Sequence, residues 1–212
     1  MISPFKELAQ NGVRRETIPD PSGGARRTLC AAPELRTARL LLRGWRAEDR
    51  DPYAAMNADA ETMQFYPSIL NRAESDARVD RAAQEWARDG YGRWAVEIPG
   101  VAPFAGYVGL KDPGFEVSAT PCLEIGWRLA REHWGHGYAT EAARAAIEFG
   151  FTQAGVDEIV AFAVPGNARS LRVMTKLGMT FSGDFDHPGV AEGHPLRRHL
   201  LYRITRGALR VQ

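Results

Sequence analysis

The sequence Arg131-Glu-His-Trp-Gly-His-Gly-Tyr-Ala-Thr-Glu141 decides how the rest of the chain is interpreted. It follows a strand-like run, Leu123 to Leu129, and leads into a helix-like run, Glu141 to Phe149. The first N–H groups of a helix have no partner within the helix, and the helix dipole adds positive potential there. Gly135 and Gly137 carry no side chains that would keep an anion away from the backbone. The stretch therefore predicts a phosphate site at the start of a helix.

The segments on either side of this turn predict a mixed α/β domain. Alternating or apolar runs predict strands at 34–43, 91–98, 104–110, 122–129, 157–164, 179–184 and 197–203. Helical spacing of apolar residues predicts helices at 47–63, 74–88, 141–154 and 168–177. The strand–helix–strand unit at 122–164 should cross over right-handedly, and the predicted hairpins make the rest of the sheet antiparallel.

Composition limits the possible classes of protein. The 212 residues carry a net charge of +1, which does not favour a large nucleic-acid surface. No apolar run is long enough for a membrane span, and the first residues do not resemble a secretory signal. Cys30 and Cys122 lie far apart and are expected to be reduced thiols, so we expect a cytoplasmic protein. Residues 1–33 are rich in turn formers and predict an irregular arm before a domain at 34–212.

Several nucleotide motifs contain two glycines in a turn, and helix packing alone also favours small residues there. The phosphate loop of kinases and GTPases needs a lysine after its last glycine, and none follows Gly137. The dinucleotide fingerprint needs a third glycine, where this chain has Thr140. That fingerprint also opens a first strand–helix unit, whereas this turn comes after three predicted strands. Neither motif fits.

A third motif does fit, and it belongs to a family. The acyl-coenzyme A loop of N-acetyltransferases reads Gln/Arg-x-x-Gly-x-Gly/Ala, and residues 132–137 match it except that Glu132 takes the first position. Other matching segments follow the family order: Thr37-x-Arg39-Leu-x-Leu-Arg43, Trp94-Ala-Val-Glu97, Glu124-Ile-Gly-Trp127, Trp134-Gly-x-Gly-Tyr-Ala-Thr-Glu-Ala142, Asn167-x-x-Ser170-x-x-Val-x-x-Lys176-Leu-Gly178 and Leu201-Tyr-Arg203. Over about residues 35–205 the chain resembles the GNAT N-acetyltransferase superfamily. It is most similar to the branch of ribosomal-protein alanine and serine N-terminal acetyltransferases.

The resemblance implies a mixed, mostly antiparallel sheet of six or seven strands, split between strands four and five and flanked by about four helices. Acetyl-CoA lies in the split, and its pantetheine pairs with the open edge of strand four. Gly126 is then a natural bulge site, unless it only makes room for a packed aromatic ring. The implied cofactor-binding residues are Trp127, Leu129, Trp134, Gly135, His136, Gly137, Tyr138, Ala139, Thr140, Asn167 and Ser170. Asn167 could instead, or in addition, be the N-cap of its helix.

Acetylation of an amine needs a neutral amine, a stabilised oxyanion and a proton for the departing thiolate. Many family members place a tyrosine acid seven residues after the asparagine, where this chain has Met174. Ser170 is therefore the candidate donor to the thiolate, and a backbone N–H within 125–127 is the candidate oxyanion donor. Glu124 is the candidate base, with a salt-bridged carboxylate as the alternative. His187 is a second candidate base, with a loop histidine bonded to the backbone as the alternative.

The five histidines show no spacing that suits a metal with cysteine or carboxylate support, so no metal is expected. The sequence predicts an acetyl-CoA-dependent N-acetyltransferase that acts by direct attack in a ternary complex, as a monomer or homodimer. A peptide or protein N-terminus is the favoured acceptor, and a small amine or antibiotic is the alternative. A non-catalytic acyl-CoA-binding regulatory domain is the alternative of another class. The acceptor depends on residues 46–93, 112–121 and 185–196.

Overall fold

The computed structural model describes residues 33–118 and 121–208, so the expected N-terminal arm lies outside the described residues except for Pro33. One sheet has the strand order β1-β2-β3-β4-β5-β6-β8-β7. The strands are β1 (Leu35–Arg36), β2 (Leu41–Arg43), β3 (Arg93–Ile98), β4 (Ala102–Lys111), β5 (Cys122–Leu129), β6 (Glu158–Ala163), β7 (Thr180–Asp186) and β8 (Arg198–Thr205). All neighbouring strands are antiparallel except β5 and β6, which are parallel. The predicted mixed, mostly antiparallel α/β fold is confirmed.

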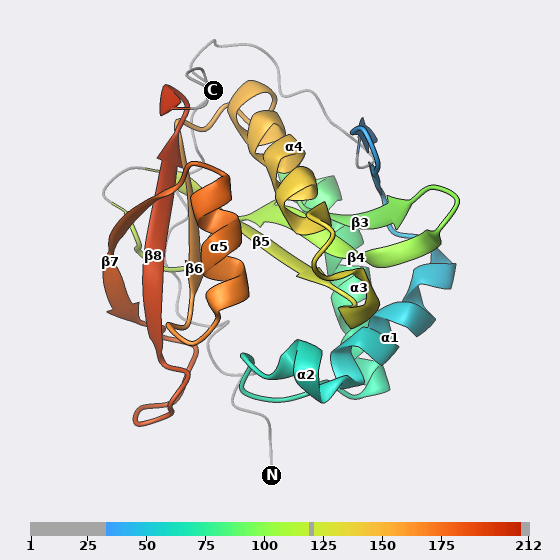
Figure 1. Cartoon of the computed structure of the whole chain (residues 1–212), viewed down its shortest axis with the longest axis horizontal. Coiled ribbons are helices and arrows are strands. Elements are labelled where there is room, and N and C mark those ends of the chain that lie inside the picture. Colours follow the sequence, from blue (N-terminus) through green and yellow to red (C-terminus); the bar gives the residue numbers. More distant parts are fainter. Residues whose placement is uncertain (1–32, 119–120, 209–212) are drawn as a thin grey trace.

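Helices cover both sides of this sheet (Figure 1). The α-helices are α1 (Arg50–Ala58), α2 (Ala60–Met63), α3 (Arg72–Asp89), α4 (Tyr138–Thr152) and α5 (Ala168–Lys176). Two short 3-10 helices are η2 (Ala47–Asp49) and η3 (Arg131–His133). In Figure 1, α4 and α5 lie next to each other in front of the sheet, and α3 lies behind it.

The sheet has more strands than expected because residues 34–43 form a hairpin rather than one strand. Between β1 and β2 the chain turns at Thr37, whose N–H donates to the carbonyl of Leu40 at 3.0 Å. The Leu40 N–H donates back to the Thr37 hydroxyl, also at 3.0 Å. The predicted helix at 47–63 is likewise broken, because the Asp59 side chain accepts from the Thr62 N–H at 2.8 Å and caps a new helix. The described residues therefore contain eight strands and five α-helices.

The sheet splits where β5 leaves β6. The two strands pair only over Cys122–Glu124, so among the described residues no strand pairs with 125–129 on the β6 side (Figure 1). The register between β4 and β5 runs without a shift from Lys111↔Glu124 to Gly106↔Leu129. The bulge expected at Gly126 is therefore wrong, because the split arises from divergence of β5 and β6. A Cβ at Gly126 would have only Glu124 Oε1 within 4 Å, at 3.9 Å, so no aromatic ring requires the glycine either.

Side chains alternate between the two faces of β5. One face joins the main core, where Ile125 packs with the residues of α4 such as Ile147. Full burial of a side chain such as Ile147 contributes about 2 kcal/mol. The other face carries Glu124, Gly126 and Arg128, at i, i+2 and i+4. A smaller core, with Tyr53, Met56, Val79, Ala95 and Phe104, lies under α1 and α3.

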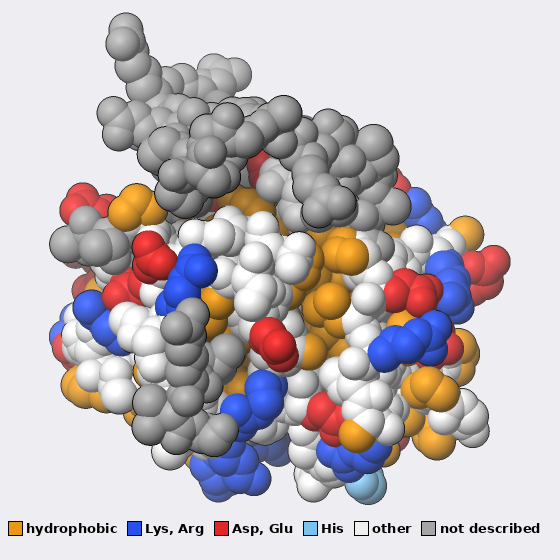
Figure 2. Space-filling view, turned by 90° about the horizontal axis from the view of Figure 1, so that it is seen from above, with side chains coloured by type: hydrophobic (Ala, Val, Ile, Leu, Met, Phe, Trp, Pro, Cys, Tyr) orange, Lys and Arg blue, Asp and Glu red, His pale blue; other side chains and the backbone are white. Residues whose placement is uncertain are grey.

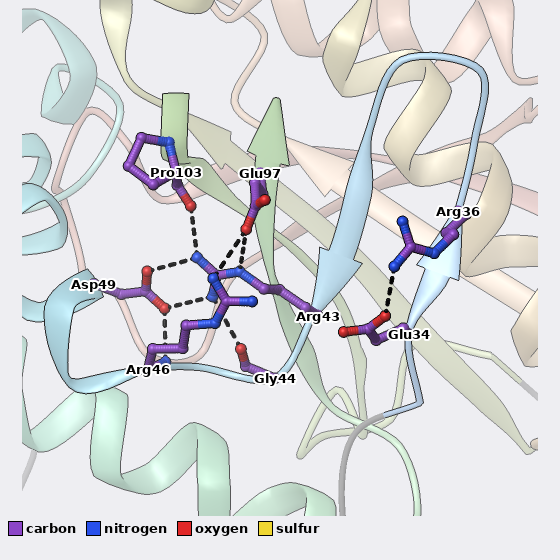
Figure 3. A network of polar contacts seen from close by, with 8 residues as sticks. All are labelled: Glu34, Arg36, Arg43, Gly44, Arg46, Asp49, Glu97 and Pro103. Atoms are coloured by element: carbon purple, nitrogen blue, oxygen red, sulfur yellow. Dashed lines mark hydrogen bonds and ion pairs between the residues drawn. The ribbon is translucent and has the colours of Figure 1, made fainter. Parts of the chain in front are cut away.

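A buried arginine ties β2 to its surroundings (Figure 3). Arg43 is 2% exposed, and its guanidinium donates to both carboxylate oxygens of Asp49 at 2.8 and 2.9 Å. Its Nε donates to Glu97 at 2.7 Å, and Nη2 donates to the carbonyl of Pro103. Every buried charge in this network has a partner of opposite sign, which offsets the cost of desolvation.

No helix in the described parts of the chain is long and apolar enough to cross a membrane. On the face shown in Figure 2, basic and acidic side chains lie interspersed among neutral ones.

Candidate functional site

The glycine turn between η3 and α4 has the backbone shape of an anion site. Gly135 and Gly137 have φ angles of 80° and 83°, which favour glycine, and Gly137 is the N-cap of α4. A Cβ at Gly135 would meet no atom within 4 Å, so the turn is open at this point. The first N–H groups of α4 have no acceptor within the helix. The 15-residue helix thus presents unpaired donors and its positive end at the turn.

The open edge of β5 and the start of α5 lie beside this turn. The Oδ1 atom of Asn167 accepts from the Ser170 N–H at 3.2 Å, so Asn167 does cap α5. The indole of Trp134 donates to the carbonyl of Leu129 at 2.8 Å. The carbonyl of Leu129, on the open edge of β5, therefore already accepts a hydrogen bond. Among the described residues, no strand pairs with this edge beyond Glu124.

A cavity of about 270 Å³ joins these elements. Ten of the eleven residues expected to bind the cofactor line it: Trp127, Leu129, Trp134, Gly135, Gly137, Tyr138, Ala139, Thr140, Asn167 and Ser170. His136 does not line it. The ring of His136 stacks on Tyr138 at 5.5 Å between centroids, and its carbonyl accepts from Arg39 at 3.0 Å.

Half of the cavity wall was not expected from the sequence. The additional lining residues are Glu61, Thr62, Phe65, Tyr66, Arg128, His133, Arg169, Arg172, Val173 and Lys176. Some come from α2, which the sequence predicted as the end of one long helix at 47–63, and from the segment just after it. Others share a helix with Asn167 and Ser170, and their spacing along α5 would have placed them on the same side.

Residues 39–180 match the family model described as an acetyltransferase (GNAT) domain. The chain belongs to the GNAT acetyltransferase family. Members of this family use acetyl-CoA, and the protein is an N-acetyltransferase.

Known proteins similar to this GNAT chain include both uncharacterised and named relatives. It is 32% identical over 155 residues to the uncharacterized protein YkkB of Bacillus subtilis, covering 72% of this chain and 88% of that one. It is 28% identical to the FsC-acetyl coenzyme A-N(2)-transacetylase of Aspergillus fumigatus, covering 84% and 79%. The ribosomal-protein-S5-alanine acetyltransferase of Vibrio fischeri shares the fold, with a TM-score of 0.66, 15% identity and coverage of 82% and 97%.

Glu124 lies on β5 of this GNAT fold but does not line the cavity. Its Oε2 atom lies 2.8 Å from Nζ of Lys111, which faces it across β4 and β5. The salt-bridged carboxylate foreseen as the alternative is therefore present. Burial raises the pKa of Glu124 even though the charge of Lys111 opposes the shift. A raised pKa suits a proton acceptor that works near neutral pH.

His187 lies in an aromatic cluster rather than in the cavity. Its ring is 5.0 Å from that of Phe115 and 5.1 Å from that of His199. The Nδ1 atom accepts from the Gly189 N–H at 3.0 Å, which is the backbone-bonded geometry foreseen as the alternative. Burial, with some help from His199 and Lys111, lowers the pKa of His187 to about 4. The ring is uncharged at neutral pH and is not part of the cavity lining.

Charged side chains form ion pairs in and beside the cavity wall. Glu61 on α2 lies 3.0 Å from Arg131 and 3.9 Å from Arg169. The guanidinium of Arg169 stacks 4.0 Å above the ring of Trp134. Among the described residues, no group of three or more His, Cys, Asp or Glu side chains is arranged to hold a metal ion.

Proposed function

We propose that the chain transfers the acetyl group of acetyl-CoA to a primary amine by direct attack in a ternary complex. The proposal rests on one observation: the glycine turn, the open edge of β5 and the start of α5 all line the same cavity. Acetyl-CoA supplies an activated acetyl group as a thioester. The cavity suits such a molecule because one end offers helix N–H groups for phosphates and the other offers an unpaired strand edge.

Each part of the chain then has a distinct task. Residues 134–140 would hold the diphosphate, and the edge at Trp127 and Leu129 would pair with the pantetheine arm. A backbone N–H within 125–127 would stabilise the negative charge that develops on the carbonyl oxygen. Ser170 would donate a proton to the departing sulfur, directly or through water. Glu124, with its raised pKa, would accept the proton of the amine through a water relay, since it does not line the cavity.

Direct attack is favoured over an acetylated enzyme. Cys122 is a free thiol outside the cavity lining, and burial raises its pKa to about 11. Such a thiol is protonated at neutral pH and is a poor nucleophile. Cys30 lies outside the described residues.

Two classes of acceptor fit the cavity differently. The sequence favours a peptide or protein N-terminus, whose α-amine has a pKa of about 8 and needs little help from a base. A small amine is the second candidate, and the presence of Arg128, which is 5% exposed, in the cavity wall favours it. A cytoplasmic location and a monomeric or dimeric state remain predictions.

A panel assay tests the proposal. Initial rates of CoA release would be measured with free N-terminal peptides, N-blocked copies of the same peptides, and small primary amines. We expect intersecting initial-velocity lines, which indicate a ternary complex, and activity only with free amines. Acetyl-CoA binding without turnover across the panel would support a regulatory domain instead, and parallel lines would indicate an acetylated enzyme.

A further inference from the structure

Arg128 is a buried cation for which residues 33–118 and 121–208 provide no carboxylate partner. The residue is 5% exposed and lines the cavity. Its described neighbours are uncharged: Nη1 donates to Asn57 Oδ1 and lies 3.1 Å from the sulfur of Met63. The guanidinium lies 3.9 Å above the ring of Tyr66 and 5.5 Å from that of Tyr107. The Nε atom is buried and has no hydrogen-bond partner.

Two other arginines of the sheet, the buried Arg43 and the partly buried Arg93, have carboxylate partners. Arg43 contacts Asp49 and Glu97, as Figure 3 shows. Arg93, on the same sheet face as Arg128, lies 2.7 Å from Glu85. A buried charge without a counter-ion is costly, and proteins rarely keep one without a use for it. Both of these arginines have a carboxylate partner, whereas no carboxylate of the described residues pairs with Arg128.

The charge of Arg128 acts on the tyrosine that faces it across the sheet. Tyr107 lies directly opposite Arg128 in the β4–β5 register. Burial alone would raise the pKa of Tyr107, but the positive charges of Arg128, Arg93, Arg78 and Lys111 outweigh burial and lower it. Because no described carboxylate pairs with Arg128, its charge would attract an anion into this part of the cavity.

The position of Arg128 on β5 determines how a bound acceptor would be oriented. Glu124, Gly126 and Arg128 follow one another on one face of β5, and the space at Gly126 is open apart from Glu124 Oε1. Residues four apart on a strand are about 13 Å apart between Cα atoms. An acceptor on this face could therefore reach Arg128 with one end while its amine lies toward Glu124 and the open edge.

We propose that Arg128 binds an anionic group of the acceptor, so that the substrate is a small primary amine carrying a carboxylate or phosphate-like group. This inference rests on the proposed acetyl transfer and specifies its substrate class. The planar guanidinium, whose Nη1 already donates to Asn57, keeps further N–H donors in a fixed plane for the oxygens of such a group. The rings of Tyr66 and Tyr107 hold the guanidinium in place before the anion arrives.

The test compares acceptors that differ only in charge. The ω-amino acids glycine, β-alanine, γ-aminobutyrate and δ-aminovalerate would each be paired with their neutral amides. Aminoethylphosphonate would be paired with ethylamine, to distinguish a carboxylate from a phosphate-like group. Spermidine and a free N-terminal peptide amide complete the panel. The variants are Arg128→Met, Arg128→Lys and the control Arg88→Met, which removes an exposed arginine at the end of α3.

We expect wild type to prefer at least one acid over its amide by roughly 10- to 100-fold in kcat/KM, the range of one charged hydrogen-bonded contact. Arg128→Met should abolish this preference by raising KM for the acid, and should leave KM for acetyl-CoA unchanged. Arg128→Lys should retain part of the preference, and Arg88→Met all of it. Equal rates for acids and amides, preference for spermidine or the peptide amide, or equal losses for acids and amides in Arg128→Met would overturn the proposal.

Calorimetric titration keeps the inference testable if Arg128→Met does not fold. The acids and amides would be titrated into the wild-type protein with and without CoA. Binding of an acid but not of its amide supports the anion site, and equal binding of both overturns it. Absence of CoA release with every amine would instead overturn the proposed transfer, which the titration distinguishes from failure of the anion site.

Discussion

Nε of Arg39 lies 2.7 Å from Oε2 of Glu141, and this contact joins residues 102 positions apart in the chain. Glu141 also accepts from the Thr37 hydroxyl at 2.6 Å and from the Arg39 backbone N–H at 2.9 Å. Arg39 donates in turn to the carbonyl of His136 at 3.0 Å and lies 4.8 Å from the ring of Tyr138. The hairpin of β1 and β2 is thereby fixed to the glycine turn.

Replacement of Glu141 should loosen this junction. We expect Glu141→Gln to lower the free energy of unfolding by about 1–2 kcal/mol at neutral pH, because it weakens several hydrogen bonds to one carboxylate. Acetyl-CoA affinity should fall several-fold as the turn becomes less ordered. The control is Glu34→Gln, which removes an exposed pair with Arg36. Urea unfolding and calorimetric titration would measure both quantities, and equal behaviour of the two variants would contradict the role of Glu141.

The same carboxylate predicts a pH dependence. Burial would raise the pKa of Glu141, but hydrogen bonds from Thr37 and Arg39 outweigh it and lower the pKa below its ordinary value of 4.5. A group with a lowered folded-state pKa stabilises the protein above the unfolded-state pKa, and this stabilisation is lost as the pH falls through the folded-state value. The advantage of wild type over Glu141→Gln should therefore begin to fall as the pH drops below about 4.5. An advantage that does not change with pH anywhere in the acid range would contradict this.

Gly137 provides a test of the phosphate site. Gly137→Ala puts a side chain at φ 83°, which costs about 1–2 kcal/mol, and places a methyl group beside the first N–H groups of α4. Gly100→Ala imposes the same backbone strain at φ 75° in the β3–β4 hairpin, where a Cβ meets nothing within 4 Å. Both should lose similar stability, whereas only Gly137→Ala should weaken acetyl-CoA binding, by roughly 10-fold. Equal affinities of the two variants would count against a diphosphate at this turn.

The sequence specified the acetyl-CoA side of the site better than the side that would hold the amine. The strand 122–129 was predicted with the bounds it has, because its apolar alternation and the glycine turn mark both ends. The break at Asp59 depends on a side-chain cap that competes with continuous helical spacing, and the spacing alone hides it. In the sequence, Arg128 looks like an ordinary strand residue whose side chain faces solvent. The packing of Asn57, Met63 and Tyr66 against that face of β5 makes it a buried cation.

The proposed base, Glu124, should determine how kcat/KM depends on pH. Because burial raises the pKa of Glu124, kcat/KM should rise with pH until this carboxyl is ionised, above the ordinary range for glutamate. Glu124→Gln should remove that limb and lower kcat/KM by about 10²- to 10⁴-fold. Glu148→Gln, an exposed change on α4, serves as control. An unaltered pH–rate profile in Glu124→Gln would assign the proton transfer to another group.

His187 should influence acid stability. Its pKa of about 4 in the folded state lies below its ordinary 6.5, so its stabilising effect is complete above 6.5 and is lost as the pH falls toward 4. Over that window His187→Gln should flatten the decline in the free energy of unfolding, by on the order of 2 kcal/mol after allowance for partial exposure. His194→Gln is the loop control. Identical pH profiles for wild type and His187→Gln would show that the ring is not kept neutral by burial.

The stoichiometry of the reaction tests acetyl transfer most directly. Purified full-length protein would be mixed with acetyl-CoA and the amine panel, and both released CoA and N-acetylated amine would be quantified by mass spectrometry. The account predicts one N-acetylated amine for each CoA released, with no acetyl group left on the protein. Release of CoA without acetylated amine, or stable binding of acetyl-CoA with no release, would contradict it.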